Sequence, residues 1–109
     1  MGLIGKVGVI GAGLMGSGIA QVVAQAGCEV VMVDVENKFL ERGFDAIRQS
    51  LGLMQKKGKI TTEEVTNVLE RIRGTLELTE AAKDADLIIE VIPENLEQKR
   101  HLFAELDKI

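Results

Sequence analysis

The 109-residue sequence contains no tryptophan, no tyrosine, one proline and one cysteine. Without those large aromatic side chains, a stacking platform for single-stranded nucleic acid is excluded. The formal net charge of −4 also disfavours nucleic acid as a partner, because its phosphates would be repelled overall. Cys28 has no second cysteine with which to form an internal disulfide, which fits a reducing compartment such as the cytoplasm. A small buried residue is a better interpretation of Cys28 than a reactive thiol.

Long apolar runs are also missing: none approaches the roughly 18 residues that a membrane span requires, so we expect no membrane segment. Glycines interrupt the apolar N-terminal stretch, and no small-residue cleavage site precedes the first fold signal, so we expect no signal peptide. The sequence has no metal-ligand spacing and no Ser/His/Asp set. His101, the single histidine, is expected to face solvent. The length suits one globular domain.

Glycine, in contrast, is abundant at 12 residues and clusters near the N-terminus. Residues 4–10 form a β-branched run typical of a strand buried on both faces. Residues 14–26 are expected to form a helix that ends at Gly27, and residues 29–35 a second strand. The expected apolar face of this helix consists of Ile19, Val22, Val23 and Ala26. This order is a βαβ unit with parallel strands.

The rest of the chain predicts an inserted helical hairpin, about 37–73, and a third strand. The first helix, 37–57, has an apolar stripe formed by Leu40, Phe44, Ile47, Leu51 and Met54. Thr61 and Glu64 match a capping box for the second helix. Residues 75–78 are expected to be a short edge segment, 86–92 a buried third strand, and Asn95 the cap of a last helix. We therefore predict an α/β fold, half of a Rossmann sheet with parallel strands in the order 3-2-1, forming one partial dinucleotide-binding domain over 1–109.

A G-x-G-x-x-G motif follows the first strand and opens the first helix. Asp34 ends the next strand 23 residues after Gly11, which is the context of a dinucleotide site. Gly11 permits the tight turn, Gly13 lets the backbone approach a pyrophosphate, and Gly16 lets helix and strand pack closely. The alternative is a glycine-rich turn without a ligand. The candidate cofactor-binding residues of the turn are Gly11, Ala12, Gly13, Leu14, Met15 and Gly16.

Asp34 is expected to accept hydrogen bonds from the adenosine ribose and to repel a 2′-phosphate. Glu36 adds a second negative charge and no arginine follows closely, so NAD is favoured over NADP. The alternative is that Asp34 only caps the following helix. Glu94 and Lys99 follow the third strand, at the rim where ligands bind in open α/β sheets. From the residues alone, ordinary surface charges are an equally good interpretation of both.

Four segments together closely resemble the NAD-binding domain of the L-3-hydroxyacyl-CoA dehydrogenases, and most of all the bacterial 3-hydroxybutyryl-CoA dehydrogenases. They read VGVIGAGLMGSGIAQVVAQAG, VDV, KKGKI and DADLIIEVIPENLEQKRHLFAELDKI. The resemblance implies hydride transfer between a 3-hydroxyacyl-CoA and NAD, in fatty acid and butanoate metabolism. It also implies that Glu94 and Lys99 contact NAD near its nicotinamide half, and that Ser50 and Lys57 contact the CoA portion of the substrate. Ser50 and Lys57 are seven residues apart, two turns along one helix face.

In that family the catalytic His–Glu pair, with its supporting Ser and Asn, follows the segment at which this sequence stops. We therefore expect no catalytic residue and no dehydrogenase activity in the chain by itself. A hypothesis of another class is a non-catalytic, self-associating half-Rossmann module. We expect a homodimer, formed through paired edges of the 4–10 strands or through the apolar faces of the helical hairpin.

Overall fold

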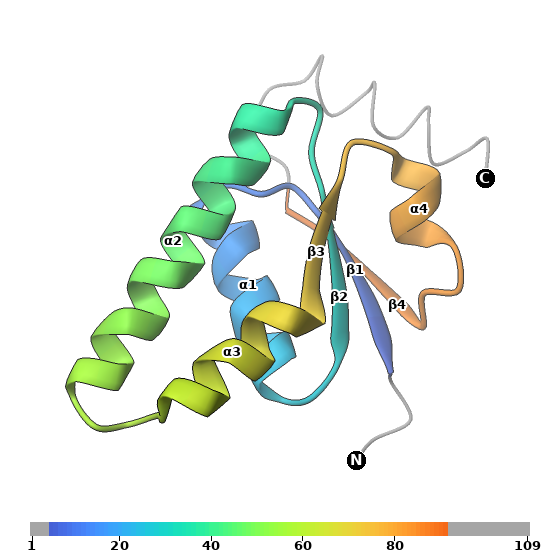
Figure 1. Ribbon diagram of the computed structural model, residues 1–109. Coiled ribbons are helices and arrows are strands. Elements are labelled where there is room, and N and C mark those ends of the chain that lie inside the picture. Colours follow the sequence, from blue (N-terminus) through green and yellow to red (C-terminus); the bar gives the residue numbers. More distant parts are fainter. Residues whose placement is uncertain (1–4, 92–109) are drawn as a thin grey trace.

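The computed structural model describes residues 5–91, which form a parallel sheet with helices on both faces. Figure 1 shows α1, α2 and α3 on one side of the sheet and α4 on the other. In chain order the elements are β1 (Lys6–Ile10), α1 (Leu14–Gln25), β2 (Glu29–Val33), α2 (Asn37–Lys56), α3 (Thr62–Arg71), β3 (Ile72–Thr75), α4 (Leu78–Ala82) and β4 (Leu87–Glu90). No helix within 5–91 is both long and apolar enough to cross a membrane.

Alternate residues along each strand point to opposite faces of the sheet and fill two separate cores. Val7, Val9, Val30 and Met32 pack beneath α1, α2 and α3, whereas Ile10, Val31 and Val33 pack against Leu78 and Ala81 of α4. Since successive side chains point to opposite faces of a sheet, continuous apolar strands need cover on both sides. This confirms the predicted α/β class and the doubly covered parallel strands.

The strand order is β3-β2-β1-β4, and every pair is parallel. The predicted order 3-2-1 is therefore present, but the segment expected to supply its third strand lies elsewhere. Leu87–Glu90, within the segment expected to be that strand, forms β4, which pairs with β1 from Val7↔Leu87 to Ile10↔Glu90. The neighbour of β2 is β3, which ends at Thr75, where the short edge segment was expected to begin.

The position of β4 corrects two further expectations. Because β1 is hydrogen-bonded on both sides, it offers no open edge, and the predicted dimer through paired 4–10 strands is wrong. The 86–92 strand is also not fully buried: Leu87 is 43% and Ile88 38% exposed. The sequence misled because β3 has only one buried residue in four, Ile72, and so carries no clear strand pattern. The more apolar run at 86–92 was therefore expected beside β2, in the position that β3 occupies.

The buried face of α1 matches the prediction only in part. Ile19 and Val23 pack against the core as expected, whereas Val22 is 65% exposed and Ala26 is exposed. The buried residues are Gly16, Ser17, Ala20, Gln21 and Ala24. Small residues spaced four apart lie on one side of a helix, and they let α1 approach the sheet closely. Close approach of these small residues therefore sets the fully buried part of the face, and Ile19 and Val23 pack beside it.

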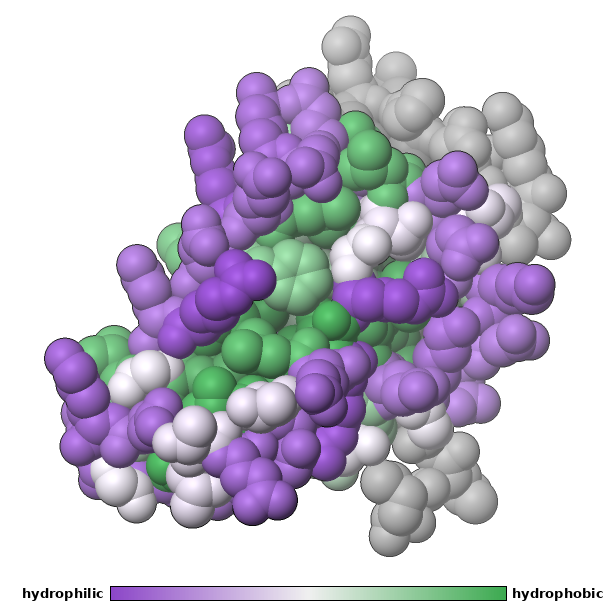
Figure 2. All heavy atoms as spheres, in the orientation of Figure 1, coloured by the Kyte–Doolittle hydropathy of each residue, from purple (hydrophilic) through white to green (hydrophobic). Residues whose placement is uncertain are grey.

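Helices α2 and α3 follow their sequence patterns. Leu40, Ile47 and Leu51 are buried, and Phe44 and Met54 pack against the same core, which confirms the predicted stripe. The capping box is also confirmed: Glu64 N–H donates to Thr61 Oγ1 at 3.1 Å, and Thr61 N–H donates to Glu64 Oε1 at 3.2 Å. In Figure 2 polar side chains cover the outer side of these helices, while apolar ones gather between α2 and the sheet.

Other predicted positions are half-buried or lie beyond the described range. Cys28 is half-buried and packs against the core, as a small apolar residue does. The expected cap at Asn95 and the last helix, including His101, lie outside the described residues.

Asp86 joins the beginnings of β1 and β4. Its Oδ2 accepts hydrogen bonds from the backbone N–H groups of Gly5, at 2.8 Å, and Lys6, at 2.9 Å. In turn, Asp86 N–H donates to the carbonyl of Lys6 at 2.8 Å. The hydrogen bonds from Gly5 and then Lys6 hold the pKa of the Asp86 carboxyl below its ordinary value, because they favour the charged form.

This lowered pKa predicts how stability depends on pH. The stabilisation by ionised Asp86 is complete above the ordinary pKa and is lost as the pH falls through the folded-state pKa. Asp86→Asn should therefore lower the melting temperature at pH 7, and the difference from the wild type should shrink below about pH 4. Circular dichroism melts across this range measure both effects. Asp84→Asn is the matched control, because it removes the same charge from the same loop, and the Asp84 side chain makes no hydrogen bond within residues 5–91. An equal loss in the two variants would contradict the role of Asp86.

Candidate functional site

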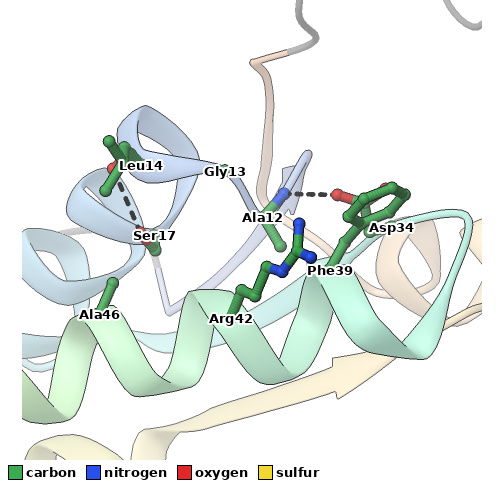
Figure 3. Close-up of a pocket in the computed structure, with 8 residues that line it drawn as sticks. All are labelled: Ala12, Gly13, Leu14, Ser17, Asp34, Phe39, Arg42 and Ala46. Carbon is green, nitrogen blue, oxygen red and sulfur yellow. Dashed lines mark hydrogen bonds between the residues drawn. The ribbon is translucent and has the colours of Figure 1, made fainter.

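A cavity of about 320 Å³ lies at the carboxyl ends of β1 and β2, beside α2. Figure 3 shows its residues converging from three elements: the glycine turn with the start of α1, the end of β2, and α2. The lining residues are Ala12, Gly13, Leu14, Ser17, Asp34, Phe39, Arg42 and Ala46. The chain thus brings together four of the predicted site residues, namely Ala12, Gly13, Leu14 and Asp34.

Two glycines shape the turn that forms one wall. Gly11 has a φ of 110°, a left-handed conformation that side chains disfavour, and its N–H donates to the carbonyl of Val33 at 2.8 Å. A Cβ at Gly16 would overlap the carbonyl oxygen of Gly11. The fold itself therefore requires both glycines, and the predicted close packing at Gly16 is what the structure shows.

Gly13 is different, because the fold does not require a glycine there. Its φ of −67° and ψ of −171° suit any residue, and a Cβ at this position would meet nothing within 4 Å. It caps the N-terminus of α1, where no side chain caps the helix and the first turn has no acidic residue. The first N–H groups of a helix lack partners within the helix and favour anions. The wall of the cavity is thus open, and suited to an anionic group that needs close contact with the backbone.

Asp34 forms the polar end of the cavity and is only 7% exposed. Its Oδ2 accepts a hydrogen bond from Ala12 N–H at 2.9 Å, and its Oδ1 accepts one from Val35 N–H at 2.7 Å. The alternative that Asp34 only caps α2 is wrong, since Glu36 is the N-cap residue of that helix. An ionised carboxylate has about four lone-pair sites, so each oxygen can accept a further hydrogen bond.

Helix α2 supplies the opposite wall because it packs very close to the glycine turn. A Cβ on Gly43 would lie 2.7 Å from the carbonyl oxygen of Ala12. This contact places Phe39, Arg42 and Ala46 around the cavity. They lie three and four residues apart, so they share one side of the helix.

Arg42 is the residue that the sequence interpretation missed. No arginine follows Asp34 closely in the sequence, but the fold brings Arg42, eight residues later, to the same cavity. The sequence did carry a signal for Arg42. It lies three residues after Phe39 and four before Ala46, so these three share a helix side next to the buried stripe. The second negative charge is also offset, because Glu36 Oε2 pairs with Lys38 Nζ at 3.1 Å.

The remaining predicted residues do not line this cavity. Met15 is 70% exposed, Ser50 is half-buried in α2, and Lys57 is exposed just beyond that helix. Glu94 and Lys99 lie outside the described residues. A more open hollow farther along α2, of about 410 Å³, is lined by Gln49, Gly52, Leu53 and Lys56. Within 5–91 no group of three or more His, Cys, Asp or Glu side chains is placed to hold a metal ion.

The chemistry of the cavity is that of a binding site. Its two ionisable side chains are Asp34 and Arg42, and the apolar groups of Ala12, Leu14, Phe39 and Ala46 make up much of the rest. Hydroxyl donors suit Asp34, an anion suits the start of α1, and a flat apolar group suits the wall that α2 forms.

Comparison with known proteins agrees with this geometry. Residues 6–109 match the family model described as 3-hydroxyacyl-CoA dehydrogenase, NAD binding domain. The chain is 50% identical to a probable 3-hydroxybutyryl-CoA dehydrogenase of Deinococcus radiodurans, over 95% of this chain and 37% of that protein. It is 43% identical to a probable 3-hydroxyacyl-CoA dehydrogenase of Caenorhabditis elegans, over 96% of this chain and 37% of the relative.

Two solved structures extend the likeness to the fold. The (S)-3-hydroxybutyryl-CoA dehydrogenase of Ralstonia eutropha is similar with a TM-score of 0.89 and 37% identity, over 97% of this chain and 37% of that one. The 3-hydroxybutyryl-CoA dehydrogenase of Escherichia coli has a TM-score of 0.85 and 38% identity, over 96% and 22% of the two chains. The chain thus spans little more than a third, or less, of the length of these relatives.

The contrast between the glycines predicts separable effects of substitution. Gly13→Ala should leave the melting temperature near that of the wild type, because its Cβ meets open space. The same methyl group should weaken dinucleotide binding by about 1–3 kcal/mol, as overpacking of a fitted contact does. Gly16→Ala should instead lower the free energy of unfolding by at least roughly that amount. Thermal melts and isothermal titration calorimetry measure the two quantities, and full dinucleotide affinity in Gly13→Ala would contradict the role of Gly13.

Proposed function

The chain belongs to the family of 3-hydroxyacyl-CoA dehydrogenase NAD-binding domains, and from this we propose that its cavity binds NAD for hydride transfer with a 3-hydroxyacyl-CoA. The observation that carries the proposal is the junction of the glycine turn with Asp34 through the 2.9 Å hydrogen bond from Ala12. This junction sets an anion-binding helix start beside a buried carboxylate that has lone pairs to spare.

The side chains and backbone around the cavity fit the parts of a dinucleotide. The N–H groups at the start of α1 would face the pyrophosphate, and the bare Gly13 would let it approach. Asp34 would accept hydrogen bonds from the adenosine ribose, and the apolar wall from α2 would lie along the adenine. When bound, the nicotinamide ring supplies the hydride chemistry.

Our proposal favours NAD over NADP for an electrostatic reason. Asp34 is buried and carries its charge where a 2′-phosphate would lie, so the two would repel one another. The negative charge of Glu36 contributes less to the repulsion of a 2′-phosphate than the sequence indicates, because Lys38 forms an ion pair with it. Discrimination thus depends on Asp34.

The substrate part of the proposal draws on the relatives. Several of them carry 3-hydroxybutyryl-CoA in their names, which supports a short 3-hydroxyacyl-CoA as the substrate of the complete protein and a place in butanoate as well as fatty acid metabolism. Ser50 and Lys57 would contact the CoA portion. Ser50 lies in the second half of α2 and Lys57 is its C-cap residue, exposed and able to meet a phosphate. Glu94 and Lys99 would contact the nicotinamide half of the cofactor.

We propose a homodimer in the cytoplasm. The apolar stripe of α2 expected at the dimer interface is packed in the core, so a dimer through the hairpin would use the other side of α2, around Leu53, which is 58% exposed. For the location, the support is the single cysteine.

Replacing Asp34 tests the proposed NAD site. Isothermal titration calorimetry should show that Asp34→Ala weakens NAD binding by about 1.5–3 kcal/mol, the usual contribution of hydrogen bonds to a charged group. Asp34→Asn keeps an acceptor oxygen without the charge, so it should raise the affinity for NADP relative to NAD. Asp45→Asn, which removes an exposed carboxylate from α2, is the control and should change neither affinity. Unchanged NAD affinity in Asp34→Ala would show that the ribose does not bind there.

A further inference from the structure

Arg42 differs from every other arginine of residues 5–91, because it has no structural partner there. Arg48 pairs with Asp45 at 3.1 Å and lies over the Phe44 ring at 5.8 Å. Arg71 donates to the carbonyl of Ala24 at 2.9 Å, and Arg73 pairs with Glu80 at 3.5 Å. Arg42 makes no hydrogen bond, ion pair or ring contact with the described residues, although its side chain lines the cavity (Figure 3).

Asp34 is the obvious partner for Arg42, but they form no ion pair. The two carboxylate oxygens of Asp34 are instead engaged by the N–H groups of Ala12 and Val35. Arg42 also cannot leave the cavity through a shift of α2, because Gly43, the next residue, packs against Ala12. The backbone thus holds an unpaired guanidinium at the wall of a largely apolar cavity.

The chemistry of a guanidinium selects what such a position binds. It is planar, more weakly hydrated than an ammonium group, and stacks on aromatic faces. The cavity is mostly apolar, about 320 Å³ in volume, and has its hydroxyl-binding carboxylate at one end. A flat heteroaromatic ring attached to a ribose matches both features. An additional phosphate matches less well, since the charge of Asp34 opposes it.

We propose that Arg42 is an adenine-binding residue, whose guanidinium lies against the face of the base while Asp34 holds the ribose. This inference rests on the proposed NAD-binding function and adds a residue that sets its affinity for the adenosine end. The Arg42 side chain is exposed, so solvent meets its guanidinium in the free chain, and a base bound in the cavity would cover it.

The test uses the purified chain with 5′-AMP and with ribose 5-phosphate, which lacks the base. Titration should show that Arg42→Ala binds 5′-AMP about threefold to thirtyfold more weakly, the range of a cation–π contact. Arg42→Lys keeps the charge without the planar face, so it should also bind 5′-AMP more weakly than the wild type. Arg48→Ala, from the outer side of the same helix, is the control and should bind 5′-AMP like the wild type. Ribose 5-phosphate should not distinguish Arg42→Ala from the wild type.

A spectroscopic signature accompanies the affinities. In NMR spectra the Arg42 Nε–H resonance should move upfield with 5′-AMP, through the ring current of the base, and not with ribose 5-phosphate. The melting temperature of ligand-free Arg42→Ala should equal that of the wild type, because no contact is lost. Equal affinity of Arg42→Ala and the wild type for 5′-AMP, or full affinity in Arg42→Lys, would overturn the stacking role.

The two proposals fail in different ways. If the wild type binds 5′-AMP and NAD but Arg42→Ala binds them equally well, the inference about Arg42 is wrong and the NAD site stands. If the wild type binds neither 5′-AMP nor NAD, the proposed function is wrong, and the inference is wrong with it.

Discussion

A single buried carboxylate holds the site together. Asp34 accepts hydrogen bonds from Ala12 in the glycine turn and from Val35 beyond β2, while Gly11 donates to the carbonyl of Val33. Hydrogen bonds to an ionised group are stronger than neutral ones, and burial strengthens them further. The turn therefore cannot shift relative to β2 without breaking them. The carboxylate that holds the turn is also the one that we propose accepts hydrogen bonds from a ribose, so the fold itself sets its position.

Packing that is close enough to exclude side chains completes this arrangement. Gly16 sets α1 against the turn, and Gly43 sets α2 against it from the other side. β1, which carries the turn, is paired on both sides, so it lies within the sheet rather than at its margin. The start of α1, the carboxylate at the end of β2 and the backbone that carries Arg42 are thus fixed relative to one another around the cavity.

The sequence by itself determined the features that depend on neighbours along the chain. The glycine motif, the long stripe of α2, and the capping box between Thr61 and Glu64 could all be predicted, because helical periodicity and turn geometry act over a few residues. The apolar runs of β1 and β2 predicted a parallel sheet covered on both sides, since only such a sheet buries successive side chains. The motif together with Asp34 predicted a dinucleotide site at the turn that lines the cavity, and this stays a prediction.

Only the tertiary structure decided which elements became neighbours. The place of β4 beside β1 depends on pairing between segments some eighty residues apart, including the hydrogen bonds of Asp86, which no local pattern encodes. The buried side of α1 was decided by how close the helix lies to the sheet, and therefore by small residues that carry little hydropathy. Arg42 entered the site through a helix–turn contact at Gly43. Local forces act within a few residues and can be read from the chain, whereas close packing depends on surfaces that exist only once the chain has folded.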